Sequence, residues 1–136
     1  MTESVLIVGA GSGLSASLAR LCSSNGMKVV LAARDIEKLQ DLKKEIGANT
    51  IKCDATKIKS VTNLFKKTDK IIGVPNLVIY NPSKSLRGSI VDLDPQKAFE
   101  AINITSYGGF LVSQQSAKRM LKKKRGSIFF TGATAS

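Results

Sequence analysis

A short apolar strand that leads directly into a glycine-rich turn constrains this chain more than any other feature. Residues 5–8 read Val-Leu-Ile-Val, residues 9–14 read Gly-Ala-Gly-Ser-Gly-Leu, and a helix-forming segment follows at 15–21. Glycines remove the side chains that would keep a phosphate away from the main chain, and a helix that begins there directs unpaired N–H groups toward it. The turn therefore predicts a nucleotide-binding site, made by Gly9, Gly11, Ser12, Gly13 and Leu14.

The segments on either side of the turn strengthen this interpretation. A second apolar segment at residues 28–34 completes a strand–helix–strand unit of about 30 residues. The glycine spacing is not the G-x-G-x-x-G form, because Leu14 occupies its last glycine position. A turn with a purely structural role remains the alternative.

The end of the second strand indicates which cofactor is bound, because the adenosine ribose lies beside it. A carboxylate there favours NAD, but Ala33 and Arg34 supply none. A guanidinium can hold a 2′-phosphate through charge-assisted hydrogen bonds, so the sequence favours NADP(H) over NAD(H). Asp35 argues for the opposite preference, and Arg34 as an ordinary exposed charge is the structural alternative.

Apolar strands and amphipathic helices alternate along the whole chain. Further strands are predicted at about 50–54, 75–81 and 127–131, with helices at 36–46 and around 61–65 and one long helix from Pro95 to Lys124, capped by Asp94. This order predicts an α/β fold, a Rossmann-like doubly wound parallel sheet, as one NAD(P)-binding domain over residues 1–136. Ligands of such sheets bind at the carboxyl ends of the strands. Arg34, Asp54 and Asn81 each follow a predicted strand, so they should lie at this edge of the sheet. The helix that bears Asn103 would need to pass beside the same edge.

Composition excludes several classes of function. Histidine is absent from the 136 residues, so imidazole bases, Ser-His-Asp triads and imidazole metal ligands are excluded, and we expect no metal site. The net charge of +11 raises the question of nucleic acid. Its densest run, at residues 118–125, falls where a helix should end and has no interleaved aromatic side chains. A solvated helix end is favoured over a binding patch.

Neither a membrane span nor a secretory signal is present in the sequence. The two cysteines, Cys22 and Cys53, do not form a CxxC pair, so we expect reduced, buried thiols. The chain is therefore expected to be cytoplasmic.

Five motifs in order resemble those of the short-chain dehydrogenases/reductases. Residues 9–15 resemble the family's Gly-x-x-x-Gly-x-Gly turn with serine in place of the last glycine, and residues 53–56 resemble its strand-three aspartate motif. Residues 80–83 resemble the Asn-Asn-Ala-Gly motif, of which only Asn81 is unchanged. Residues 102–104 resemble the helix motif with the active-site asparagine, and 126–131 the strand that leads to the catalytic serine.

The resemblance implies roles for individual residues. Asp54, with Ala55, would meet the adenine amino group, Asn81 would have a backbone role at strand four, and Asn103 would hold a water in a proton relay. The family's serine falls on Ala133, so either the register differs, or Thr134 or Ser136 takes the hydroxyl role, or the site is impaired. We select Asn103 and Thr134 as the catalytic candidates.

The family's helical Tyr-x-x-x-Lys pair has no counterpart before Ser136. The string from Tyr80 to Lys84 straddles a predicted strand end and contains Pro82, so it is rejected as a catalytic pair. The resemblance implies an NADP(H)-dependent oxidoreductase that acts on a carbonyl or alcohol, with this chain as its N-terminal cofactor-binding part, truncated after the fifth strand. The isolated chain should bind cofactor better than it catalyses.

Other expectations follow from the same resemblance. Relatives are often dimers or tetramers, so we expect a homo-oligomer, and a fifth strand left at the sheet edge should promote self-association. A catalytically silent NADP(H)-binding module is the first alternative function, and a basic nucleic-acid-binding protein is the second and less favoured one.

Overall fold

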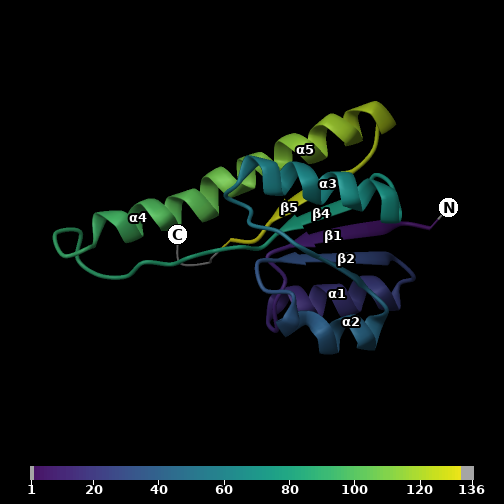
Figure 1. Ribbon diagram of the computed structural model, residues 1–136, viewed down its shortest axis with the longest axis horizontal. Helices are drawn as coiled ribbons and strands as arrows, with labels where there is room; N and C mark the ends of the chain where they lie inside the picture. Colours follow the sequence, from purple (N-terminus) through teal and green to yellow (C-terminus); the bar gives the residue numbers. More distant parts are fainter. Residues whose placement is uncertain (1, 133–136) are drawn as a thin grey trace.

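The computed structural model describes residues 2–132 as one five-stranded parallel sheet with helices on both faces (Figure 1). Helices α1 and α2 lie on one side of the sheet, and α3 and α5 lie on the other. The elements, in chain order, are β1 (Ser4–Val8), α1 (Leu14–Ser24), β2 (Lys28–Ala33), a 3-10 turn (Glu37–Leu39), α2 (Gln40–Ile46), β3 (Asn49–Lys52), α3 (Ile58–Ile72), β4 (Leu77–Tyr80), α4 (Pro95–Ile102), a π turn (Asn103–Tyr107), α5 (Gly108–Lys123) and β5 (Ser127–Phe130).

The strand order is β3-β2-β1-β4-β5, and every neighbouring pair is parallel. The chain moves outward from β1 through β2 to β3 and then returns to the other side of β1 with β4. Strand order therefore reverses between β1 and β4, where crossover connections diverge and leave a crevice at the carboxyl ends of the strands. The predicted Rossmann-like doubly wound fold is confirmed.

Two apolar cores, one on each face of the sheet, hold the layers together. Successive residues of β1 point to opposite faces, so Leu6 and Val8 enter the core under α3 and α5, whereas Val5 and Ile7 enter the core over α1 and α2. All five residues of β1 are buried, as expected for a central strand covered on both faces. The site described below is thus built on the most deeply buried strand.

The predicted strand positions are correct, but the four strands after β1 are each shorter than expected. β3 ends at Lys52 and β4 begins at Leu77 and ends at Tyr80, so Asp54 and Asn81 follow the strands rather than belonging to them. Both cysteines are free and buried, which confirms the expectation for these thiols. The predicted start at Asp94 is also confirmed, because its carboxylate accepts hydrogen bonds from the backbone N–H groups of Gln96 (2.8 Å) and Lys97 (3.1 Å) ahead of Pro95.

The predicted long helix from Pro95 is present and runs to Lys123, but its helical geometry changes partway along. A π turn at Asn103–Tyr107 separates α4 from α5 and inserts one additional residue into the helical turn. The side chain of Tyr80, which projects from β4, donates a hydrogen bond from its hydroxyl group to the carbonyl of Ile104 within this turn. Sequence periodicity does not reveal this turn.

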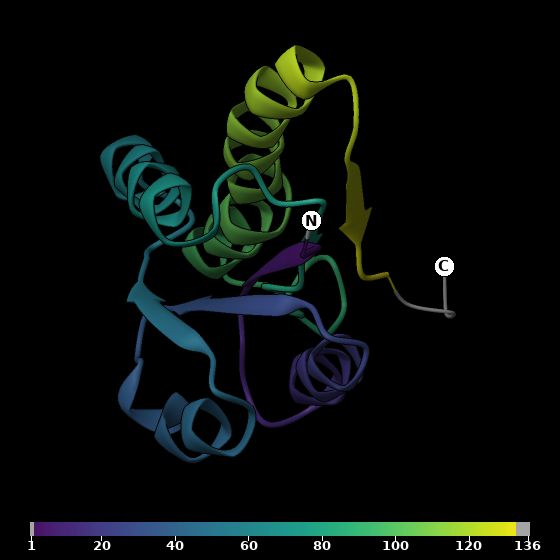
Figure 2. The same ribbon diagram turned by 90° about the vertical axis from the view of Figure 1, so that its right-hand side faces the viewer.

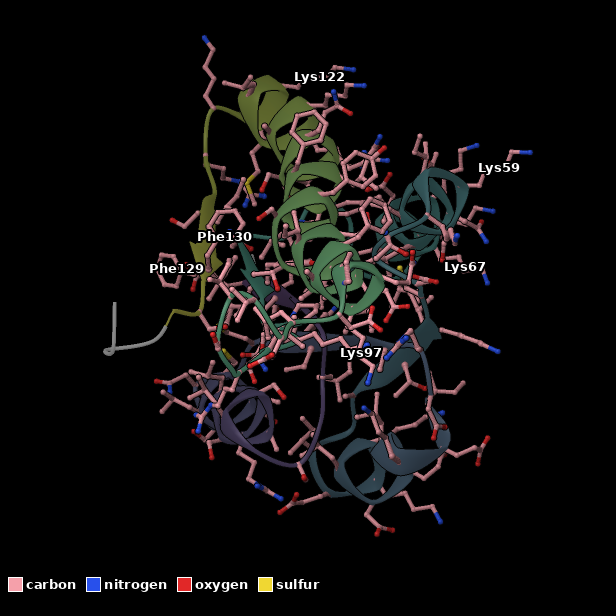
Figure 3. The ribbon with its side chains drawn as sticks, turned by 90° about the vertical axis from the view of Figure 1, so that its left-hand side faces the viewer. Lys59, Lys67, Lys97, Lys122, Phe129 and Phe130 are labelled. Carbon is pink, nitrogen blue, oxygen red and sulfur yellow. The ribbon has the colours of Figure 1, made fainter. Side chains whose placement is uncertain are left out.

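Strand β5 lies at the edge of the sheet and, among the described residues, pairs only with β4 (Figure 2). Its two phenylalanines are largely exposed, Phe129 at 57% and Phe130 at 58%. Figure 3 shows Phe129 pointing away from the rest of the molecule. The expected exposed edge is therefore present, with unpaired backbone groups beside apolar side chains.

This edge predicts self-association that a single charge should suppress. Substitution Phe129→Lys places a cation on the exposed strand and should lower the associated fraction in sedimentation velocity experiments, because like charges oppose edge pairing. Ile90→Lys, in a loop where the side chain is 86% exposed, is the matched control and should leave the distribution unchanged. Equal association of wild type and Phe129→Lys would contradict the prediction.

Candidate functional site

A cavity of about 510 Å³ opens at the carboxyl ends of the strands, beside the point where strand order reverses. Every strand from β1 to β4 contributes residues from its end or the turn that follows it, and the π turn contributes one more. The lining residues are Val8, Gly9, Ala10, Ala33, Arg34, Asp35, Lys38, Cys53, Ala55, Asn81, Pro82, Ser83 and Ile104. Of the residues predicted to meet here, Gly9, Arg34 and Asn81 line this cavity, whereas Asp54 lines a neighbouring hollow.

The glycine turn after β1 forms one wall of this cavity. Gly9 has a φ of +82°, and a Cβ there would lie 2.5 Å from the Cδ of Pro82, so both the backbone angle and the close approach of the next strand's loop require glycine. At Gly11 and Gly13 an added Cβ would meet nothing within 4 Å. The chain's own packing leaves the surface over these two glycines open to a ligand.

Helix α1 begins immediately after the turn and has no side-chain cap at Gly13. The N–H groups of its first turn are therefore directed toward whatever lies over the glycines, and the helix dipole adds positive potential there. Ser12, Gly13 and Leu14 are exposed at this end of α1, outside the lining of the cavity itself. An anion at this position would meet backbone donors rather than side chains.

Ser15 shows what replaces the last glycine of the resembling motif. Its side chain is buried, with 2% exposed, and its hydroxyl accepts a hydrogen bond from the N–H of Gly11 at 2.8 Å. The serine therefore braces the turn from within, and the N–H of Gly11 is already used by the protein. The departure from the motif is compatible with the same turn.

Three charged residues surround the end of β2. Arg34 is exposed and lines the cavity, as predicted. The carboxylate of Asp35 accepts a hydrogen bond from the N–H of Glu37 at 3.0 Å, so it caps the 3-10 turn. Lys38 also lines the cavity, a residue that the sequence analysis did not select. Arg34 precedes the helical segment that bears Lys38, so the i, i+4 spacing of a helix face does not link the two, and no sequence signal identified Lys38.

Asp54 is held in a fixed orientation by its neighbours. Its Oδ1 accepts hydrogen bonds from the N–H of Thr56 at 3.0 Å and from the Thr56 hydroxyl at 2.6 Å. Burial by itself raises the pKa of Asp54, but these hydrogen bonds and the nearby cations Lys57 and Arg34 outweigh it and lower the pKa below its usual value. The carboxylate is therefore ionised at neutral pH and has its other oxygen available to a donor.

Asn81 joins three strands at their carboxyl ends. Its Nδ2 donates to the carbonyl of Gly9 at 3.4 Å, and its Oδ1 accepts from the hydroxyl of Thr131 at 2.8 Å. Its backbone N–H donates to the carbonyl of Val8 at 2.9 Å. This residue therefore fixes the glycine turn after β1 against the segment after β5.

Asn103 lies at the start of the π turn and lines a second, polar hollow of about 360 Å³. Arg34 and Ile104 line this hollow and also the first cavity, so the two are adjacent. Asp54, Thr56, Ser83, Lys84 and Glu100 complete the lining. The structure thus brings Asn103 and Asp54 to the same side of the site, while Ala133, Thr134 and Ser136 lie outside the described residues.

The string from Tyr80 to Lys84 does not form a helical pair. Tyr80 ends β4, is 3% exposed and donates its hydroxyl proton to Ile104, and burial raises the pKa of Tyr80 to about 12. Lys84 lies in the following loop and forms an ion pair with Glu100 of α4 at 2.7 Å. The two side chains serve different contacts, which agrees with rejecting them as a catalytic pair.

Two further observations concern residues 2–132 alone. Within them no cluster of three or more His, Cys, Asp or Glu side chains is placed to hold a metal ion. None of the helices in this part of the chain combines the length and apolarity that crossing a membrane requires.

The chain is similar to proteins of known family. The family model described as short chain dehydrogenase matches residues 3–136. An uncharacterised oxidoreductase of Staphylococcus aureus (strain USA300) is 30% identical over 132 residues, and one of Thermotoga maritima is 28% identical over 134 residues. These alignments cover 94% and 95% of this chain but 57% and 52% of the relatives. The chain therefore spans little more than half the length of these curated relatives.

Solved structures share the fold. A short-chain type dehydrogenase/reductase from Mycobacterium marinum superposes with a TM-score of 0.91 at 24% identity, covering 96% of this chain and 56% of that one. A variant of actinorhodin polyketide ketoreductase, solved with NADPH, gives a TM-score of 0.90 at 23% identity, covering 98% and 56%. A short-chain dehydrogenase from Rhodopseudomonas palustris gives 0.89 at 28% identity, covering 98% and 65%.

The glycines of the turn should respond differently to alanine. Gly9→Ala forces a side chain into a left-handed backbone angle and against Pro82, and should lower the free energy of unfolding by about 2–5 kcal/mol. Gly11→Ala meets no neighbouring atom and should change it by less than about 1 kcal/mol. Urea unfolding followed by circular dichroism measures both. Equal destabilisation by the two substitutions would contradict the described turn.

Proposed function

The chain belongs to the short chain dehydrogenase family, and from this premise we propose that it is the NADP(H)-binding part of an oxidoreductase that acts on a carbonyl or alcohol. The observation that carries the proposal is that Gly9 at the start of the glycine turn lines one cavity with Arg34, Lys38 and Asn81, at the point where strand order reverses. The bound nicotinamide would supply or accept a hydride in such a reaction.

The residues present fit a dinucleotide diphosphate. Gly11 and Gly13 have open space where a Cβ would project, and the uncapped first turn of α1 supplies N–H donors beside them. A diphosphate over the turn would gain hydrogen bonds and a favourable helix dipole without displacing any side chain. Gly9, Gly11, Ser12, Gly13 and Leu14 would form this part of the site.

The adenosine end would meet the residues after β2 and β3. Asp54, ionised and oriented by Thr56, would accept a hydrogen bond from the adenine amino group beside Ala55. Arg34 and Lys38 are two cations in the same cavity, whereas the carboxylate of Asp35 is partly engaged by the N–H of Glu37. Positive charge at this end favours the 2′-phosphate of NADP(H) over the ribose hydroxyl of NAD(H).

In this proposal the chain would supply polar support for the reaction. Asn103 would hold a water for proton transfer, and Asn81 would keep the turns after β1 and β4 in place. Thr134 is proposed for the hydroxyl role at the substrate carbonyl. We expect the isolated chain to bind cofactor and to show little or no carbonyl-dependent oxidation of NADPH. Appreciable oxidation of NADPH by the isolated chain would contradict this expectation. A longer protein that contains this chain and binds the cofactor without any turnover would favour the catalytically silent module.

The cofactor preference is tested by titration. NADPH should bind at least about tenfold more tightly than NADH, and Arg34→Gln should weaken NADPH binding by about 10- to 100-fold while changing NADH binding little, because only NADPH has the 2′-phosphate. Arg125→Gln, at the opposite end of the sheet, is the matched control and should leave both affinities unchanged. Fluorescence or calorimetric titration gives the dissociation constants.

Three outcomes separate the candidates for this site. Absence of binding to either dinucleotide would refute the proposed function. Equal binding of NADPH and NADH in wild type would refute the preference alone. Binding of single-stranded nucleic acid with a steep salt dependence would favour the basic-protein alternative. The distribution of lysines does not favour that alternative, because those labelled in Figure 3 project from three different helices. They are Lys59 and Lys67 of α3, Lys97 of α4 and Lys122 of α5.

A homo-oligomer is part of the proposal. No residue of α4 or the π turn is buried, and the α4–α5 rod bears the exposed apolar residues Phe99, Ile102, Tyr107 and Phe110. The rings of Tyr107 and Phe110 stack with centroids 6.3 Å apart. An apolar surface of this kind typically marks a protein interface, and a second copy of the chain is the proposed occupant.

The two free, buried cysteines suit a reducing compartment, and we propose the cytoplasm.

A charge in the middle of this surface should separate the copies. Phe110→Lys should shift the mass in light scattering toward the monomer, because an unpaired cation would be buried in the interface. The exposed-loop variant Ile90→Lys again serves as the control. An unchanged mass for Phe110→Lys, together with a monomer for Phe129→Lys, would place the association at the edge of β5 instead.

A further inference from the structure

Tyr80 occupies the place where the resembling motif has its first asparagine, and its contacts suggest a specific role. The side chain is 3% exposed and lies in the core beneath α5. Its hydroxyl reaches across to the π turn and donates to the carbonyl of Ile104. A buried tyrosine hydroxyl needs a hydrogen-bond partner, and here that partner is a backbone carbonyl of another element.

The π turn provides the acceptor for this hydrogen bond. A π turn replaces i→i+4 hydrogen bonds by i→i+5 bonds, so carbonyls within it are less completely paired than those of a regular α-helix. The Ile104 carbonyl lies within this turn and accepts the hydrogen bond from Tyr80. The burial that raises the pKa of Tyr80 to about 12 also keeps the hydroxyl protonated, and therefore a donor, at all ordinary pH values.

Gly108 shows that the fit is specific. This residue begins α5 directly after the π turn, and a Cβ on it would overlap the hydroxyl oxygen of Tyr80. The ring carbon Cζ of Tyr80 would lie 3.3 Å from the same Cβ, and the carbonyl of Ala55 would lie 3.1 Å from it. The large side chain on β4 and the missing side chain on α5 are thus complementary.

The position of the π turn matters for the site. Ile104 lines both the cavity and the adjoining polar hollow, and Asn103 lines the hollow. The helical rod that bears them is otherwise weakly anchored at this point, since none of the residues in α4 or the π turn is buried. Whatever fixes the turn also fixes these two residues relative to the strand ends.

We infer that Tyr80 is a positioning residue, which clamps the π turn through the Ile104 carbonyl and so holds Ile104 and Asn103 at the wall of the cofactor site. This role goes beyond the proposed function, although its effect on NADPH affinity rests on it. Phe130, whose ring centroid lies 6.2 Å from that of Tyr80, supports the ring from the side of β5. The clamp is therefore built from β4, β5 and the π turn together.

The first test removes the hydroxyl group alone. Tyr80→Phe should accelerate hydrogen exchange of the amides of residues 103–109 by about 3- to 10-fold, because one hydrogen bond that restrains the turn is lost. It should weaken NADPH binding by a similar factor. Tyr107→Phe removes the chain's other tyrosine hydroxyl, from a side chain that is 41% exposed, and should change neither quantity.

A comparison with a second variant separates positioning from general destabilisation. Ile79→Ala alters the neighbouring residue of the same strand, which is 3% exposed and faces the other core. It should lower the melting temperature at least as much as Tyr80→Phe does, yet leave exchange in residues 103–109 and NADPH affinity unchanged under conditions where the protein is folded. If both variants affected exchange and affinity alike, Tyr80 would have a merely structural role.

A double-mutant cycle tests the contact itself. Gly108→Ala should be strongly destabilising in the wild-type background and clearly less so in the Tyr80→Phe background, because the overlapping oxygen is then absent. Additive effects would overturn the inference, as would unchanged exchange in Tyr80→Phe. If wild type bound no NADPH, the proposed function would fail, and the exchange measurement and the cycle would still decide the role of Tyr80.

Discussion

The close approach of the turns that follow β1 and β4 is the constraint on which the rest of the site depends. Parallel pairing of these strands brings their carboxyl ends together, and Gly9 then lies against Pro82 so closely that only glycine fits. Asn81 adds hydrogen bonds to Gly9 and to Thr131 across the same junction. Because these contacts fix three strand ends, the crevice beside them has a defined shape before any ligand arrives.

The two sides of the site offer different kinds of binding group. The turn after β1 offers backbone donors and a helix N-terminus, which suit a diphosphate of any dinucleotide. The ends of β2 and β3 offer side chains instead. In the proposed function, Asp54 would meet the adenine that both dinucleotides share, and Arg34 and Lys38 would choose between them. Recognition of the nucleotide class would then rest largely on the main chain, and the choice between cofactors on two residues that substitution can change.

The long rod of α4 and α5 combines a well-anchored half with a poorly anchored one. Arg119 of α5 forms an ion pair with Asp69 of α3 at 2.9 Å and lies over the ring of Phe65, 5.2 Å from its centroid. Within residues 2–132, α4 has no buried residue; its Glu100 pairs with Lys84, and the clamp at Tyr80 holds the π turn that follows it. This difference explains why one hydroxyl group on β4 can influence residues at the wall of the site.

The sequence by itself determined the order of strands and helices, the glycine turn, the Asp94 cap and the cavity positions of Arg34 and Asn81, because these follow from local periodicity, steric freedom and the rule that parallel strands end together. Only the tertiary structure decided the π turn, the role of Tyr80, the entry of Lys38 into the cavity and the bracing of the turn by Ser15. Each of these depends on a contact between elements or on the direction of a side chain, and neither is encoded in the spacing of residues along the chain.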